Sequence, residues 1–195
     1  MVQNENSVIT KRKFAHYLLL SFLFWVIPFL IRLFLLDGRT IEKPNPEYNF
    51  KVIEDVTGHL LINDRLSVFY LIFKNNLKVC IINIAGGAMF GLVTVSNLIW
   101  NGFYAADVFA TIHFNGMSII KILKHTMPHS FELLGIWLSG ALGFCQAKLL
   151  ILYMKGKELH IVGFLLFAIK CFLIIITIIL LSAFIETFIS IPFAK

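Results

Sequence analysis

Long runs of apolar residues limit what this chain can fold into more than any single motif does. Strong runs occupy about residues 17–36, 77–100, 128–154 and 160–192. An α-helix rises ~1.5 Å per residue, so each run is long enough to cross the ~30 Å hydrocarbon core of a lipid bilayer. The strands of a membrane barrel would alternate apolar and polar residues, which these runs do not do. We therefore predict an all-α fold, a polytopic transmembrane helical bundle with four firm spans in a single domain.

Composition supports a membrane protein and argues against other classes. Hydrophobic residues make up 58% of the 195 residues, above the ~45–50% of ordinary soluble domains. The formal net charge of +6 does not indicate nucleic-acid binding, because the basic residues are scattered at the ends of the apolar runs, where they orient helices and meet anionic lipid. Cys80, Cys145 and Cys171 lie inside apolar runs without metal-ligand spacing, so we interpret them as small buried residues.

The first part of the chain predicts a cytoplasmic N-terminus. A polar tail, residues 1–16, contains Lys11, Arg12 and Lys13 shortly before the first apolar run. That run is longer than a ~7–15-residue signal-peptide core and no small-residue cleavage site follows it, so we predict an uncleaved span. Positive residues flank spans on the cytoplasmic side, so residues 37–76 are expected to form an external loop.

The polar segments between the spans leave alternatives open. Late in the external loop, apolar residues recur at helical spacing, which fits either an interfacial helix or a packed loop over the bundle. These residues are Leu66, Phe69, Tyr70 and Phe73. Residues 101–127 are too polar for an ordinary span. They form either a re-entrant hairpin, with short helices from about residues 105 and 118 broken at Asn115–Gly116, or a fifth span.

Small residues predict where helices pack closely. Gly87 and Gly91 form a GxxxG pair in the second run, and Gly135, Ser139 and Gly143 recur every four residues in the third. Small side chains at this spacing give a helix one smooth face on which another helix can approach. We predict that these five residues are helix-packing positions.

An ionisable pair stands at the start of the third run. His129 and Glu132 are i, i+3 neighbours on a helix that Pro128 begins. The third and fourth spans are antiparallel, so Glu186, near the end of the last run, is expected on the same side of the membrane. If residues 101–127 are re-entrant, Asn101 joins this cluster.

A charged side chain near a membrane interior is costly, so we expect the cluster to have a catalytic or a structural role. One interpretation is catalytic: His129 acts as a general base, Glu132 orients it and Glu186 assists, as in a hydrolase or peptide ligase. The other is structural, with hydrogen bonds that hold helices together. His125 extends the spacing to that of a metal-ligand set, but Pro128 interrupts the helix, so we predict no bound metal and no cofactor.

Several stretches together resemble the stage II sporulation protein M (SpoIIM-like) family of integral membrane proteins. They are FKNNLK before the second run, GGAMFG, the Asn101–Gly102 pair, MPHSFELLGIWLSGALG and AFIETF, and they extend over roughly residues 73–191. Ser130 stands where the family commonly has glycine. The resemblance implies a shared polar core, which in this sequence comprises Asn76, Asn101, Gly102, Pro128, His129, Glu132 and Glu186.

The resemblance implies function only within broad limits. Family members are similar to a component of the forespore engulfment machinery that works with cell-wall hydrolases. Short relatives occur beside ATP-binding transporter subunits in clusters that make, mature and export circular bacteriocins and confer immunity. This chain, in which we expect no soluble domain, resembles the second group. It contains no Walker A, HExxH or GxSxG motif, so we expect it not to power transport by itself.

The leading prediction is a multi-pass subunit of a bacterial cell membrane that takes part in maturation, export or immunity of a secreted, bacteriocin-like peptide. Its expected partners are the lipid bilayer, other membrane subunits, an ABC-type ATPase and the peptide, with a homo-oligomer as a further alternative. Two other functions stay open. They are an intramembrane hydrolase or peptide ligase (cyclase), and a non-catalytic scaffold of an envelope-remodelling complex.

Overall fold

The computed structural model describes residues 11–36, 64–114, 116–126 and 129–190, and the regular structure in these ranges is helical throughout. The long helices are α1 (Lys11–Leu36), α3 (Arg65–Ala85), α4 (Leu92–Phe114), α6 (His129–Met154) and α7 (Ile161–Ile185). The shorter elements are α5 (Ile119–Thr126), the 3-10 helix η1 (Gly86–Met89) and the π-helix η2 (Glu186–Ser190).

Four helical segments are long and apolar enough to cross a membrane. They are Lys13–Leu36, Arg65–Met89, Phe131–Met154 and Ile161–Ile189. The predicted all-α fold with four long apolar helices is therefore confirmed. The 23-residue helix α4 is not one of the four, because Asn97, Asn101 and Asp107 interrupt its apolar sequence.

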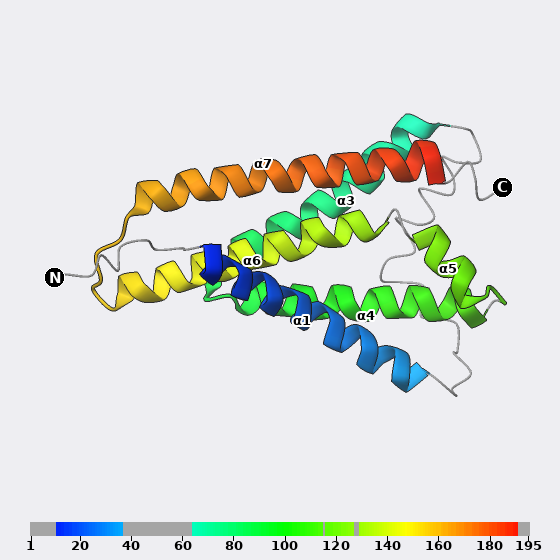
Figure 1. The fold of residues 1–195 in the computed structure, drawn as a ribbon, viewed down its shortest axis with the longest axis horizontal. Coiled ribbons are helices and arrows are strands. Elements are labelled where there is room, and N and C mark those ends of the chain that lie inside the picture. The colour runs from blue at the N-terminus through cyan, green and yellow to red at the C-terminus, as the bar shows by residue number, and fades with distance from the viewer. Residues whose placement is uncertain (1–10, 37–63, 115, 127–128, 191–195) are drawn as a thin grey trace.

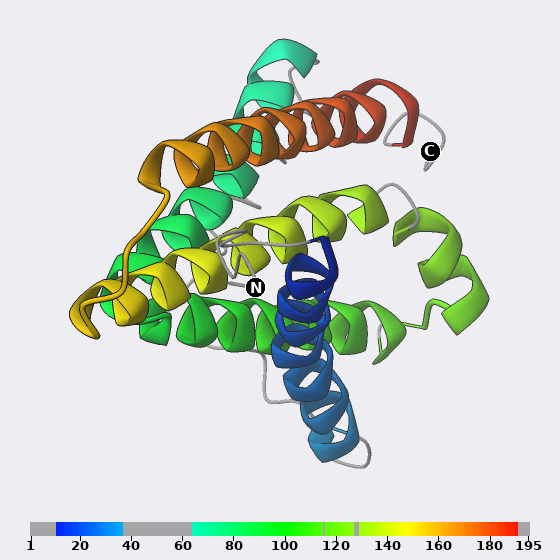
Figure 2. The same ribbon diagram turned by 60° about the vertical axis from the view of Figure 1, so that its left-hand side comes forward.

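Helix α6 is the centre of the bundle. It packs against α1, α3 and α7, which lie around it in Figures 1 and 2. The buried share of the most apolar stretch is 56% for α6, compared with 11% for α7 and 17% for α1. The other long helices therefore keep most of their apolar surface for lipid or for other proteins.

Pairs of neighbouring residues fix the directions of the helices. Helices α1 and α4 are parallel, because Trp25 faces Gly102 and, further along both helices, Arg32 faces Asp107. Helix α3 is parallel to α6, and each is followed by an antiparallel helix, α4 and α7 respectively (Figure 1). We call the end where α1 begins the Lys13 end, and the end where α7 stops the Glu186 end.

The single helix predicted over residues 77–100 is two helices in the structure. The chain turns at Gly86–Gly91, where Phe90 and Gly91 have φ angles of 56° and 82° and the N–H of Gly91 donates to the carbonyl oxygen of Gly86 (3.1 Å). A Cβ on Gly86 would meet the backbone nitrogen of Thr94 at 2.5 Å. The glycines thus reverse the chain at the Lys13 end, which a β-carbon would obstruct.

Helix α3 starts earlier than predicted. The carboxylate of Asp64 caps it by accepting a hydrogen bond from the N–H of Ser67 (3.1 Å). The separate interfacial helix expected around Leu66 to Phe73 is the first half of α3. The remainder of the expected external loop, residues 37–63, and the tail 1–10 lie outside the described residues.

The segment 101–127 also differs from the expectation. Helix α4 continues through Asn101 without interruption, so the predicted start of a short helix near residue 105 is wrong. The predicted break at Asn115–Gly116 does fall between α4 and α5, where Gly116 has a φ angle of 94°. A left-handed backbone of this kind ends a helix and is favoured by glycine.

Candidate functional site

Four polar side chains from three helices form a chain of hydrogen bonds inside the bundle. Asn101 donates to Asn97 (3.2 Å), Asn97 donates to Asn83 (2.7 Å), and Asn83 donates to the hydroxyl of Ser139 (2.9 Å). Ser139 in turn donates to the carbonyl oxygen of Ile136 (2.7 Å). We call these four residues the amide chain; it joins α4 to α3 and α3 to α6.

Further bonds to the backbone hold the amide chain in place. The amide nitrogen of Asn83 also donates to the Ile136 carbonyl oxygen (3.3 Å), and that of Asn97 to the Val79 carbonyl oxygen (3.2 Å). The Thr94 hydroxyl donates to the Asn83 carbonyl oxygen (2.7 Å). Asn83 and Ser139 are fully buried. Because the polar atoms of Asn83 are bonded, its burial is compatible with stability.

The chemistry of the amide chain is limited. Carboxamide side chains do not gain or lose protons near neutral pH, so they serve neither as general bases nor as steps of a proton relay. Their partners come from neighbouring helices in fixed geometry. The bonds of the amide chain therefore join α3, α4 and α6.

Small residues let the helices approach closely around the amide chain. A Cβ on Gly143 would clash with the carbonyl oxygen of Asn83, and one on Gly87 would clash with the carbonyl oxygen of Gly143. On another side of α6, Gly135 faces Ile179 of α7. The predicted packing residues of α6 thus lie at contacts with α3 and α7.

Glu132 and Asn76 are placed at one depth, closer to the Glu186 end. Asn83 is level with Ile136 and Ser139 on the parallel helix α6. Seven residues earlier on each helix, Asn76 is level with Glu132. Each retains only 9% of its accessible surface. A carboxylate so deeply buried is costly unless it is compensated, so Glu132 marks a site of interest.

Asn101 lies near the same depth. Its neighbour Asn97 contacts Val79 and Asn83 on the antiparallel helix α3. One turn later on α4, Asn101 is therefore about one turn closer to the Glu186 end, toward the level of Asn76. Gly102 follows it and faces the backbone of Trp25 on α1.

Glu186 occurs where the last helix changes its geometry. It is the first residue of the π-helix η2, which packs against α3, and the next residue, Thr187, is 1% exposed. Since Gly135 faces Ile179 in an antiparallel pair, Glu132 and Glu186 are separated by about 6 Å along the bundle axis. Single π-helical turns of this kind are frequent at functional sites.

Asn76 and Asn101 lie near the middle of α3 and α4, and Glu132 and Glu186 lie toward the Glu186 end; we call these four residues the polar layer. His129 is the first residue of α6, but its side chain and all of Pro128 lie outside the described residues. The interaction of His129 with Glu132 therefore stays a prediction. In the described part of the chain, no group of three or more His, Cys, Asp or Glu residues could hold a metal ion.

Sequence reasoning missed the two residues at the centre of the amide chain, Asn83 and Asn97. A signal was present: Asn76, Cys80 and Asn83 recur at helical spacing, as do Asn97 and Asn101. It also missed the ion pair between Arg32 of α1 and Asp107 of α4, whose Nε and Oδ1 atoms are 2.8 Å apart. The sequence signal for this ion pair is that each of the two opposite charges interrupts an apolar helix.

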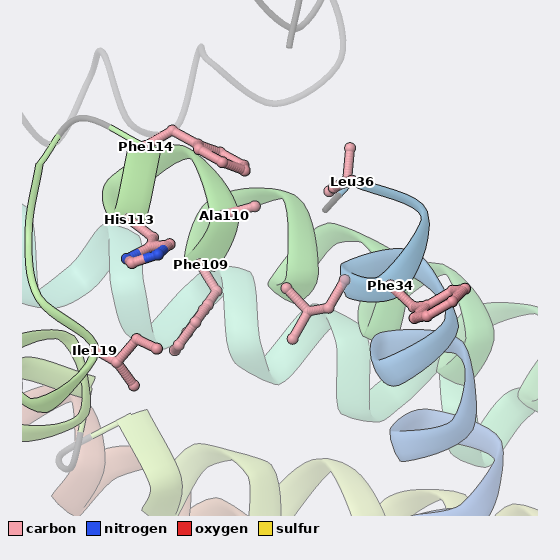
Figure 3. A pocket seen from close by; sticks show the side chains of 8 residues that line it. Phe34, Leu36, Phe109, Ala110, His113, Phe114 and Ile119 are labelled. Carbon is pink, nitrogen blue, oxygen red and sulfur yellow. The ribbon is translucent and has the colours of Figure 1, made fainter. Parts of the chain in front are cut away.

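A shallow pocket of about 300 Å³ lies at the Glu186 end, apart from the polar layer. It is formed by the ends of α1 and α4 and the start of α5, and Figure 3 shows Phe109, His113 and Ile119 on one side and Phe34 and Leu36 on the other. Its lining is almost entirely hydrocarbon. It offers no convergent polar groups for chemistry.

Comparisons with known proteins agree with this architecture. The family model described as stage II sporulation protein M matches residues 20–191. The uncharacterized protein MJ0793 of the archaeon Methanocaldococcus jannaschii is 35% identical over 129 residues, which cover 63% of this chain and 70% of that protein. No solved structure matches. The chain belongs to the stage II sporulation protein M family of membrane proteins.

Proposed function

We propose that the protein is a membrane subunit that takes part in maturation, export or immunity of a secreted peptide. In this proposal it works with other membrane proteins and an ABC-type ATPase subunit. The resemblance of this short chain to proteins of bacteriocin clusters motivates the proposal. The observation that carries it is the amide chain, since an interior built from helix-joining amides suits a subunit that positions helices and partners.

The polar layer is the proposed contact region for the peptide or for a conformational change. Buried carboxylates within a bundle are expensive and are retained where they meet a substrate or a partner. The two carboxylates of the layer, Glu132 and Glu186, lie toward the Glu186 end. Lys13, Lys155 and Lys157 all lie at the opposite end, and positive residues favour the cytoplasmic side. We therefore orient the N-terminus to the cytoplasm of a bacterial cell, and Glu132 and Glu186 to the external half of its membrane.

The experiment that tests this proposal combines purification with a secretion assay. The tagged full chain should co-purify with a membrane protein or an ATPase, and deletion of its gene should lower peptide secretion or self-protection. Glu132→Gln should reduce the phenotype while the protein stays in the membrane, and the exposed Asn75→Ala is the matched control. Normal secretion and protection after deletion, together with purification free of partners, would contradict the proposal.

A second candidate function is an intramembrane hydrolase or peptide ligase. The depth of Glu132 favours it, because a carboxylate with 9% exposure can hold a catalytic histidine in one orientation. In this candidate His129 is the base, Glu132 orients it and Glu186 assists. Purified protein should then process a peptide, and His129→Ala and Glu132→Gln should abolish processing without altering folding. Undiminished turnover by both variants would remove this candidate.

A further inference from the structure

The hairpin of α6 and α7 extends past the other helices at the Lys13 end. The ring of Phe14, close to the start of α1, packs against Phe167 of α7 (5.3 Å between centroids), and Gly91 packs beside Ala147 of α6. Beyond these levels α6 continues for about seven residues and α7 begins about six residues earlier. At ~1.5 Å per residue the hairpin projects about 10 Å, as Figure 1 shows on its left side.

The projecting hairpin exposes large apolar side chains. Its opposite face, including Phe164 and Phe167, packs against the hydrophobic core. The exposed residues retain 56–73% of their accessible surface: Tyr153, Met154, Ile161, Val162, Leu165 and Leu166. A contiguous surface of this kind marks a contact with a membrane or with another molecule.

Basic residues flank this apolar surface in the sequence. Residues 148–170 contain Lys148, Lys155, Lys157 and Lys170, all exposed, and Glu158 is their one acidic residue. The local charge is therefore strongly positive. Lysines beside an apolar helical face are typical of segments that lie among anionic lipid headgroups, with ammonium groups near the phosphates.

The length of the last helical segment places this surface in the headgroup layer. Ile161–Ile189 has 29 residues, which at ~1.5 Å each span about 43 Å, more than the ~30 Å hydrocarbon core. Lys170 limits how far the bundle can shift toward the Glu186 end, because with residue 161 at the membrane boundary the exposed Lys170 would lie about 13 Å inside the hydrocarbon core. The excess length therefore lies at the Lys13 end, where the hairpin projects.

We propose that the α6–α7 hairpin binds anionic phospholipids of the leaflet at the Lys13 end. The lysines contact the lipid phosphates, and Ile161, Val162, Leu165 and Leu166 lie between the first segments of the acyl chains. The positive charge favours this occupant over a second copy of the chain, since two such hairpins would repel each other. The proposal is independent of the role in peptide handling.

Native mass spectrometry of the purified full chain tests the proposal. The protein is released from micelles that contain equal amounts of phosphatidylglycerol and phosphatidylcholine, and the bound lipids are counted. Wild-type protein should retain phosphatidylglycerol over phosphatidylcholine. The double variant Lys155→Gln/Lys157→Gln should lower phosphatidylglycerol retention at least threefold. The matched control, Lys74→Gln/Lys78→Gln on the exposed face of α3, should lower it much less.

Two outcomes would overturn the proposal. One is equal retention of the two lipids by wild-type protein, and the other is the same loss in the hairpin variant and the control. A second readout checks depth in vesicles that contain phosphatidylglycerol. A fluorophore on Val162→Cys, in a background without other cysteines, should be quenched more by a nitroxide near the lipid headgroup than by one at the end of the acyl chain. Absence of quenching by either lipid would show a hairpin covered by protein or water instead.

Discussion

At the scale of single residues, Asn83 contributes most to joining the helices. Its side chain bonds to Ser139 and to the Ile136 carbonyl oxygen on α6, and it accepts from Asn97 on α4. Each bond between membrane helices contributes modestly, about 0.6 kcal/mol on average. Because three such bonds meet at one fully buried side chain, Asn83 joins α3, α4 and α6 in a specific arrangement.

Replacing Asn83 should therefore destabilise the bundle. We expect Asn83→Ala to lower the free energy of unfolding by roughly 1–3 kcal/mol, because it removes three bonds and leaves polar partners unsatisfied. Thermal or denaturant unfolding in mild detergent measures the change. The control is Asn75→Ala on the exposed side of the same helix, which should have almost no effect. Equal stability of the two variants would contradict the role of the amide chain.

Substitution of Gly143 tests whether the stability of the bundle depends on the close approach of α3 and α6. A Cβ at this position would clash with the Asn83 carbonyl oxygen, whereas a Cβ at the helical Gly163 meets no atom within 4 Å. Gly143→Ala should cost roughly 1–3 kcal/mol of stability through overpacking. Gly163→Ala should be neutral or slightly stabilising, because alanine favours helix. A neutral effect at both positions would show that the two helices can separate freely.

At the scale of elements, α1 and α4 form a tight parallel pair. Gly102 lets the backbone of Trp25 approach, the rings of Phe29 and Phe109 are in edge contact (6.2 Å between centroids), and Arg32 pairs with Asp107 further along. This pairing helps to hold α4 within the bundle although Asn97, Asn101 and Asp107 interrupt its apolar sequence. The ion pair neutralises Asp107, one of the charged residues that make residues 101–127 unsuited to a span by sequence alone.

A double-mutant cycle measures the coupling of Arg32 and Asp107. Their side chains are 41% and 35% exposed, so solvent and headgroups screen the pair and we expect a coupling of roughly 0.5–1 kcal/mol. Arg32→Gln and Asp107→Asn should each destabilise the protein, and the double variant should lose less than the sum of the two. Strict additivity in detergent unfolding experiments would show that the pair contributes nothing.

Apolar run length predicts that helices form and that four of them can cross a membrane, because burial of apolar surface in lipid depends little on partners. The turn at Gly86–Gly91 could not be predicted in this way. Its glycines stand in an uninterrupted apolar run, and Phe90, which has a positive φ angle, is not a residue type that predicts a left-handed backbone.

The candidate site was predictable to a smaller extent. Glu132 and Glu186 attract notice because charge among apolar residues is rare, and the contacts of α6 with α7 place both near one end of the bundle. Asn83 and Asn97 carry no charge, and their partners are distant in sequence. Their hydrogen bonds form because α3 and α4 are an antiparallel pair. The interpretation of residues 77–100 as one helix does not predict that pair.

At the scale of the whole molecule, the protein is a bundle around α6 with two different ends. The Lys13 end carries Lys13, Lys155, Lys157 and the projecting hairpin, and the Glu186 end carries Glu132, Glu186 and the pocket. All of this depends on the chain reversal between α3 and α4. The reversal makes α4 a neighbour of α3 and thereby brings Asn97 and Asn101 into the interior.

Cysteine labelling of Ala88 tests this reversal most directly. In a background without other cysteines, Ala88→Cys should react with a membrane-impermeant maleimide from the side of the Lys13 end, because Ala88 is exposed in the turn. Lys157→Cys should react from the same side and Ser118→Cys from the opposite side. A single helix over residues 77–100 would bury residue 88 in the bilayer. Failure of Ala88→Cys to react from either side, with both controls labelled, would contradict the account.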